Sequence, residues 1–512
     1  MLKARKVHKH STAKSERSKV MKASTNAITH MNWQTIDPKV SSESVRRLQN
    51  RIVIAMKADR KRMVHKLQKL LVKSLSGREL AVKRVSENKG KKTPGVDGKL
   101  LDTPKRKREC VKELSITPSK YKSQALKRIE IPKRNGKTRP LGIPTVFDRA
   151  MQALYKLALE PLAEIQADDH SYGFRPKRSA QDAMRRLQAM SSWRRSPQWI
   201  LEADIKGCFD NISHEWLQKH IPLPKTLLKQ WLKAGFVFDK KFYATNSGTP
   251  QGGIISPILA NMVLDGLEDI VKSYSKGVSI IVNGVKQRTW EGYSFTRYAD
   301  DFVVIGHNPE RLKQIMQEME IFLAERGLEF SKVKTKITNI HEGFNFLGFH
   351  LRKYPKGKLI VKPSKENIQR LKQEIRAIFK RYRASHLLVL IRALNPMLRG
   401  WGNYFRFANS SVTFNHIDQY VWYKSMQWVK RRHQRRRVFH YVAHYFNKVF
   451  PFQYEVLSYE LLQVAVLRMI PIKTFPLIKA EANVFDREYN EYFKKRFLHL
   501  KLLTIANHSV SA

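Results

Sequence analysis

The stretch FTRYADDFVVIG, residues 295–306, sets an acidic pair, Asp300 and Asp301, between two apolar segments. Apolar runs that flank a short polar segment in this way predict a strand, a turn and a second strand. Another apolar run, WILEADI at 199–205, predicts a further strand, and Asp204 stands near its end. An Asp-Asp pair by itself is more often a solvated turn. Together, the two stretches predict strand ends that bring three carboxylates to one place.

Three clustered carboxylates suit polynucleotide synthesis. That reaction uses two Mg²⁺ ions: one activates the primer hydroxyl, and the other holds the triphosphate and the leaving group. Mg²⁺ prefers hard oxygen ligands, and rigid neighbouring strands would keep both ions in line with the reacting atoms. We therefore expect Asp204, Asp300 and Asp301 to be catalytic residues that bind metal.

The charge of the chain indicates a polyanionic partner. Among 512 residues, 97 Lys and Arg stand against 43 Asp and Glu, so the formal net charge is +54. Nucleic acid is the partner that this balance favours, and a ribosomal-type structural protein or a membrane-surface binder is the alternative. The two cysteines, Cys110 and Cys208, cannot build a zinc ribbon or a disulfide framework. No apolar run reaches the ~18 residues that a membrane span needs.

The first 30 residues are expected to form a basic, disordered arm that touches RNA. Residues 1–22 hold eight Lys or Arg and no apolar core, which excludes a secretory signal. An organellar transit peptide is the other interpretation of this composition. We expect a cytoplasmic, nucleoprotein-associated protein.

Periodicity predicts the remaining elements. Apolar residues at three-to-four spacing predict helices over 42–83, 148–166, 387–398 and 417–429, and one that starts near Ser364. Strands are expected at 128–132 and in hairpins that turn at 134–137 and at Asn283-Gly284. Ser213 is expected to cap a helix.

Sequence blocks along the chain occur in an order that resembles group II intron reverse transcriptases. RYADDF (297–302) resembles their YxDD box, TPGVDG (93–98) their N-terminal block, and LNPMLRGWGNYF (394–405) their maturase, or X, region. The other matching blocks are RIEIPKRNGKTRPLGIPTVFDRAMQ (128–152), SYGFRPKRSAQDA (171–183), ADIKGCFDNISH (203–214), GTPQGGIISPILAN (248–261), GLEFSKVKTKI (327–337) and FNFLGF (344–349).

The resemblance implies an α+β, right-hand polymerase followed by a helical thumb. Residues 31–125 would extend the fingers, 126–352 would form fingers and palm around an antiparallel sheet, and 361–440 would form the thumb and maturase domain. The implied function is RNA-directed DNA synthesis together with assistance to the splicing and mobility of a parent intron. The implied partners are group II intron RNA, an RNA template with its DNA primer, deoxynucleotides and target DNA.

The resemblance also implies a metal site with two Mg²⁺ ions. Asp204 and Asp300 would bind both ions, with Asp301 close by and the Ile205 carbonyl as an auxiliary ligand. Lys334 would lie on the nucleotide side and steady the aspartates, although an ordinary solvated lysine is the alternative.

Four more residues would contact the incoming nucleotide. Lys133 and Arg139 would clamp the triphosphate, because a guanidinium matches phosphate oxygens, and Gln251 would touch the nucleotide. Phe209 would act as a steric gate against a 2′-OH, with a core aromatic as the alternative.

RNA contacts are expected in the thumb. Trp401 is expected to pack in a core, whereas a direct grip on RNA is expected from these residues: Arg399, Tyr404, Lys430, Arg431, Arg432, Arg435, Arg436 and Arg437.

The last segment, 441–512, is expected to be a DNA-binding-like remnant without an endonuclease. EANVFDREYNEYFKKR (481–496) resembles the stretch that often precedes an HNH nuclease, yet no cysteine follows Cys208 to supply the zinc ligands seen beside many such nucleases. Two other functions stay open. One is a non-enzymatic RNA-binding maturase, and the other is a reverse transcriptase recruited to immunity or repair.

Overall fold

The computed structural model describes residue 33 and residues 37–132, 138–193, 196–250, 252–282, 285–433, 438–449 and 454–505. The basic arm predicted for residues 1–30 and the turns predicted at 134–137 and Asn283-Gly284 lie outside these ranges. Helices come first, helices and strands are interspersed through the middle of the chain, and helices dominate again later, so the α+β class is confirmed.

Helices from the N-terminal part pack against one long central helix. They are α2 (Pro38–Lys57), α3 (Lys61–Lys73) and α4 (Leu75–Glu87), and the long helix is α6 (Val146–Gln166); α5 (Pro104–Glu113) packs on α4. Val45, Ile52 and Leu71 are buried against Leu162 of α6. The helical prediction for 42–83 is confirmed, but the run is broken at Asp59, which has φ 48, and at the cap residue Ser74.

The sheet that carries the aspartates has strand order β10-β3-β9-β8, and its strands are antiparallel. Its strands are β3 (Trp199–Asp204), β8 (Ser294–Tyr298), β9 (Asp301–Gly306) and β10 (Lys336–Asn339). Alternate residues feed two cores: Leu201 and Val304 enter one, whereas Ile200 and Val303 enter the other. Burial on both faces explains the near-continuous apolar runs in the sequence.

Short helices surround this sheet. They are α7 (Ala180–Ser191), α8 (Cys208–Asn211), α9 (His214–His220), α10 (Lys225–Leu232), α11 (Ser256–Leu264), α12 (Leu267–Ser273) and α13 (Pro309–Ala324). The side chain of Ser213 caps α9 by accepting from the Trp216 amide, as predicted.

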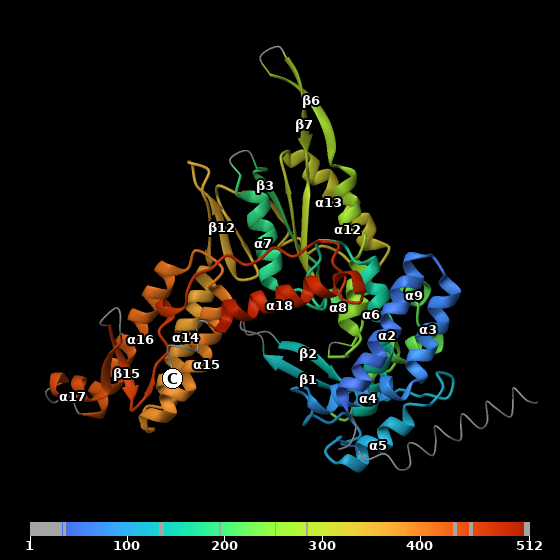
Figure 1. Ribbon diagram of the computed structural model, residues 1–512, viewed down its shortest axis with the longest axis horizontal. Helices are drawn as coiled ribbons and strands as arrows, with labels where there is room; N and C mark the ends of the chain where they lie inside the picture. Colours follow the sequence, from blue (N-terminus) through green and yellow to red (C-terminus); the bar gives the residue numbers. More distant parts are fainter. Residues whose placement is uncertain are drawn as a thin grey trace, which may run out of the picture.

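Two smaller β-structures flank the sheet. One has order β2-β1-β4-β5, from β1 (Leu126–Pro132), β2 (Thr138–Ile143), β4 (Phe236–Phe238) and β5 (Lys241–Tyr243). The other is the projecting hairpin of β6 (Lys276–Val282) and β7 (Val285–Glu291), at the top of Figure 1. Both predicted hairpin pairings are confirmed, since Pro132 pairs with Thr138 and Val282 pairs with Val285.

The C-terminal part is mainly helical and shares one core. It contains β11 (Phe344–Phe346), β12 (Phe349–Lys353), β13 (Leu359–Pro363), α14 (Lys365–Arg381), α15 (Leu387–Phe405), α16 (Ser411–Arg432), α17 (Val438–Tyr445), β14 (Phe446–Val449), β15 (Tyr454–Tyr459), β16 (Leu462–Gln463), η2 (Leu467–Met469), η3 (Arg487–Tyr489) and α18 (Asn490–Ile505). Ser364 caps α14, as predicted.

Residues on both sides of the predicted boundary at 440 share one hydrophobic core. Leu457, Leu467 and Ile478 are buried in the same core as Leu394 of α15 and Phe414 of α16. In Figure 1, this region lies opposite the helices α2–α4, and α18 crosses between the two. Within the described ranges, no helix is both long and apolar enough to cross a membrane.

Candidate active site

Strand pairing brings the three aspartates together. In the register of β3 with β9, Asp204 stands directly opposite Asp301. Asp300 lies in the turn between β8 and β9, one residue before Asp301. Ala299 has φ 59, a left-handed conformation that is uncommon for a residue with a side chain. The turn is therefore tight, and it needs support from its surroundings to hold this shape.

That support comes from the loop 168–178. The Tyr172 amide donates to the Arg297 carbonyl at 2.9 Å, and the Arg297 amide donates to the His170 carbonyl at 2.9 Å. Gly173 lies so close to the turn that a Cβ there would stand 2.3 Å from the Ala299 nitrogen. Only glycine fits this position, so the backbone of the loop buttresses the catalytic turn directly.

A buried arginine holds the turn from behind. Arg297 is 0% exposed, and its guanidinium forms an ion pair with Asp265 and lies 3.6 Å from Asp168. The same group donates to the Ala299 carbonyl at 3.5 Å and to the side chain of Asn261 at 3.3 Å. Any movement that separated Arg297 from its buried carboxylate partners would leave an unpaired charge in the interior, which is costly. The turn that is bonded to Arg297 is therefore held in place.

The site is electrostatically crowded. The Asp301 side chain has an edge open to solvent, yet desolvation and then the carboxylates of Asp300 and Asp204 raise its pKa, to about 7. Burial also raises the pKa of Asp300. The Lys334 amine donates to both carboxylate oxygens of Asp204, at 2.9 and 3.0 Å, and this hydrogen bond raises the pKa of Lys334. Lys334 therefore contacts Asp204, and its predicted role of steadying the aspartate pair stays a prediction.

The donor set fits a hard divalent cation. The raised pKa values of Asp300 and Asp301 reflect in part the repulsion between neighbouring negative charges, which a bound cation would relieve. Carboxylate oxygens are also the ligands that Mg²⁺ prefers. In the described part of the chain, no three His, Cys, Asp or Glu side chains are already gathered at ligand distances. The Asp204 carboxylate is instead hydrogen-bonded to the Lys334 amine. The Ile205 carbonyl stays a predicted ligand.

Two of the four residues predicted to contact the nucleotide, Phe209 and Arg139, lie around the same turn. Phe209 on α8 is half-buried, and its ring meets the exposed Phe174 edge-on at 6.2 Å between centroids. The Phe209 carbonyl accepts from the Thr249 amide at 2.7 Å, which joins α8 to the loop 247–250. Arg139 on β2 is exposed, and its charge offsets a small part of the rise that burial causes in the pKa of Asp300, so it faces the site. Lys133 and Gln251 lie outside the described residues.

Three family models match this chain in consecutive order. The N-terminal domain of reverse transcriptase matches 33–114, the reverse transcriptase (RNA-dependent DNA polymerase) model matches 131–351, and the group II intron maturase-specific domain matches 368–446. Protein YkfC of Escherichia coli is 33% identical over 299 residues, which cover 52% of this chain and 77% of that protein.

The chain belongs to the group II intron reverse transcriptase–maturase family. Its relatives include the group II intron-encoded protein LtrA of Lactococcus lactis, at 28% identity over 69% of this chain and 73% of that protein. The putative COX1/OXI3 intron 1 protein of Saccharomyces cerevisiae is 27% identical over 55% of this chain and 39% of that protein.

Exposed cations of the maturase region gather at the end of α16. Lys430 and Arg431 are exposed, and so is Arg399 on α15. Arg432 is exposed too, but its guanidinium donates to the Ser385 carbonyl at 2.9 Å and covers the Trp428 ring. Arg435, Arg436 and Arg437 lie outside the described residues.

Tyr404, which was predicted to contact RNA, makes two contacts within the protein. The Tyr404 hydroxyl donates to the Leu347 carbonyl at 2.9 Å, and its ring stacks on Phe349 at 5.4 Å. Both groups through which a tyrosine grips RNA are thus used inside the reverse transcriptase–maturase. Trp401 packs on Phe405 and Phe414, so its predicted core role is confirmed.

Sequence reasoning missed Gly173 and Arg297 as supports of the site. Arg297 did carry a signal, because a charged residue between the apolar Phe295 and Phe302 must find a buried partner if the strand is buried. Its partners, Asp265 and Asp168, come from other elements and could not be named from spacing.

Proposed function

We propose that this reverse transcriptase–maturase copies RNA into DNA by two-metal nucleotidyl transfer in a right-hand polymerase. The sheet β10-β3-β9-β8 corresponds to the palm, the sheet β2-β1-β4-β5 with helices α2–α6 to the fingers, and α14–α16 to the thumb. The observation that carries the proposal is the pairing of Asp204 with Asp301 beside Asp300. Primer extension on an RNA template in magnesium tests it.

Asp204, Asp300 and Asp301 would hold two Mg²⁺ ions, which when bound activate the primer hydroxyl and balance charge on the triphosphate. The protein contributes orientation. The Lys334 amine holds the Asp204 carboxylate in place, and the exposed Arg139 guanidinium is placed to bind phosphate oxygens. Phe209 would lie under the sugar, where its ring excludes a 2′-OH. Deoxynucleotides, target DNA and the template–primer duplex are the substrates of this proposal.

The maturase region assists the splicing of the parent intron through charge and shape. Large RNAs fold slowly because their phosphates repel one another, and cations on two distant regions can hold separated RNA elements together. The three aspartates are present and correctly paired, which argues against a purely non-enzymatic maturase. Intron RNA domains around the gene would exclude recruitment to immunity or repair.

Replacing Phe209 by valine is expected to relax sugar selection. Because its ring is half-buried at the site and packs edge-on against Phe174, removing its bulk leaves room for a 2′-OH. We expect ribonucleotide incorporation relative to deoxynucleotide incorporation to rise roughly a hundredfold, or about 3 kcal/mol of discrimination. Steady-state extension with ATP and with dATP on poly(rU)/oligo(dA) measures this ratio. An unchanged ratio would assign the ring to packing.

Replacing Lys430 and Arg431 together by alanine is expected to weaken binding to intron RNA. Each lost phosphate contact should reduce the slope of log affinity against log salt by roughly one unit or less. Filter binding between low and moderate salt measures the slope. The matched control replaces Arg311 and Lys313 on α13, which removes the same charge elsewhere. An equal change in the control would show that the grip on RNA is diffuse.

A further inference from the structure

The segment 479–496, here called the brace, is packed onto the polymerase part of the chain. Val484 and Phe485 are 7% and 8% exposed, and they form a small core with Val53 of α2. Asn483, Asp486 and Arg496 are also buried. A segment that hides both apolar and polar side chains in this way is part of the fold.

Ion pairs and hydrogen bonds fasten the brace to the N-terminal helices. The Arg46 guanidinium on α2 donates to the Val484 carbonyl at 3.1 Å and to the Asn490 side chain at 2.7 Å. The Lys57 amine, at the end of α2, lies 2.5 Å from the Asp486 carboxylate. The brace therefore follows α2 along its length.

A buried ion pair fastens the other end of the brace beside the palm sheet. Arg496 and Asp182 are 5% and 1% exposed at their side chains, and they form an ion pair. Asp182 belongs to the capping box at the start of α7. The same Arg496 donates to the Pro476 carbonyl at 2.9 Å, which ties the end of the brace to the chain just before its start.

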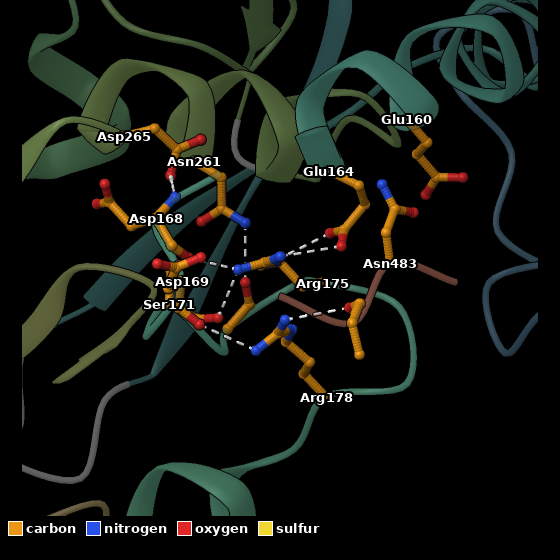
Figure 2. A network of polar contacts seen from close by, with 12 residues as sticks. Glu160, Glu164, Asp168, Asp169, Ser171, Arg175, Arg178, Asn261, Asp265 and Asn483 are labelled. Atoms are coloured by element: carbon orange, nitrogen blue, oxygen red, sulfur yellow. Dashed lines mark hydrogen bonds and ion pairs between the residues drawn. The ribbon is translucent and has the colours of Figure 1, made fainter. Parts of the chain in front are cut away.

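Arg178 joins the brace to the loop 168–178 (Figure 2). Its guanidinium donates to the carbonyls of Ala480 and Ala482, at 2.6 and 3.3 Å, and to the Asp169 carbonyl at 3.1 Å. Figure 2 shows Arg178 reaching from the loop toward the chain that carries Asn483. The loop and the brace therefore share one guanidinium.

Arg175 makes the loop itself rigid. Its guanidinium meets both oxygens of Glu164, at 2.9 and 3.0 Å, and donates to the carbonyls of Asp168 and Ser171, at 2.6 and 3.0 Å. Because the buried Arg175 guanidinium makes hydrogen bonds in all of these directions, the loop around it has little freedom to move. A displacement at Arg178 is therefore passed along the loop.

The far side of this rigid loop carries the catalytic turn. His170 and Tyr172 bond to the Arg297 backbone, and Gly173 touches Ala299, next to Asp300. The path from the Ala480 carbonyl to the turn is a continuous chain of hydrogen bonds and close contacts. Such contiguous networks can couple distant sites by modest free energies.

We propose that the brace is a positioning element for the catalytic turn of the polymerase, acting through Arg178 and anchored by Arg496. The inference rests on the proposed polymerase function. From the sequence, residues 479–496 are expected to belong to a DNA-binding-like remnant. Our proposal gives them a role in the chemical step instead. The brace touches no reacting atom, so its residues are positioning residues.

The test compares primer extension by full-length Arg178→Ala, Arg178→Lys and Arg496→Ala variants on poly(rA)/oligo(dT). Arg178→Ala and Arg496→Ala should lower kcat about tenfold, within the range of coupling through a packed network, and leave KM for dTTP and RNA affinity within about twofold. Arg178→Lys should recover part of the loss. Arg487→Ala is the matched control, because Arg487 lies on the brace but is exposed. It should extend like the wild type.

Three results would overturn the inference while leaving the polymerase function in place. One is unchanged kcat in Arg178→Ala and Arg496→Ala while the wild type extends. Another is loss of target-DNA binding without loss of kcat, which would assign the segment to DNA contact. The third is recovery of full kcat in the variants at a temperature well below their Tm, which would reduce the brace to global stability. A wild type that fails to extend the primer at all would overturn the proposed function itself.

Discussion

Primer extension is expected to fall roughly a thousandfold or more when Asp300 is replaced by alanine, because in the proposed mechanism the lost carboxylate would be a ligand of both metal ions. RNA binding should stay within about twofold of the wild type, since dozens of distant cations provide it. Extension of oligo(dT) on poly(rA) and filter binding of intron RNA measure the two quantities. Asp269→Ala, an exposed aspartate on α12, is the matched control and should behave like the wild type.

The same Asp300→Ala variant is expected to keep its splicing activity. Our proposal assigns splicing assistance to cationic surfaces, which this substitution leaves intact, and not to the metal site of the polymerase. Splicing rates of the cognate intron at moderate magnesium measure this. If the variant loses splicing assistance as fully as extension, the two activities share a site and our separation of them is wrong.

Replacing Gly173 by alanine is expected to reduce extension about a hundredfold. The new Cβ would stand 2.3 Å from the Ala299 nitrogen and 2.9 Å from the Tyr298 carbonyl carbon, so the catalytic turn or the loop must move. A shift of about 1 Å at reacting groups can cost a hundredfold in rate. Single-turnover extension measures the chemical step, and thermal unfolding reports on the fold.

Gly90→Ala is the matched control for this substitution. A Cβ at Gly90 would meet its nearest neighbours at 3.4 and 3.7 Å, which is ordinary contact. The control should extend primers at the wild-type rate. Full activity of Gly173→Ala would mean that the turn tolerates displacement, and that the contact with the loop does not set its geometry.

The catalytic strands could be predicted from the sequence because their signals are local. The apolar runs on either side of Asp300 and Asp301 define β8 and β9, and both faces of these strands are buried. Ser213 and Ser364 indicate where two helices begin, because a serine side chain can accept a hydrogen bond from a backbone amide in the first turn. These elements follow from residues within a few positions of one another.

The parts that could not be predicted depend on contacts between residues far apart in the chain. Arg496 is separated from Asp182 by 314 positions, and Arg178 from Ala480 by 302. No periodicity in the sequence indicates such a partner, so the sequence alone gives 441–512 as a DNA-binding-like remnant and names none of its contacts with the polymerase part. The same limit explains Tyr404, whose stacking partner Phe349 belongs to another element. The two arginines and Tyr404 are residue types that are common on protein surfaces, yet here their side chains make contacts inside the protein.

The most direct test of the central claim is primer extension by the purified wild-type protein on poly(rA)/oligo(dT) with dTTP across a magnesium titration. Our account predicts extension that requires magnesium, stops in excess EDTA and returns when magnesium is restored. Extension that persists in excess EDTA would contradict a metal-dependent site at Asp204, Asp300 and Asp301, and no extension at any magnesium concentration would contradict polymerase activity.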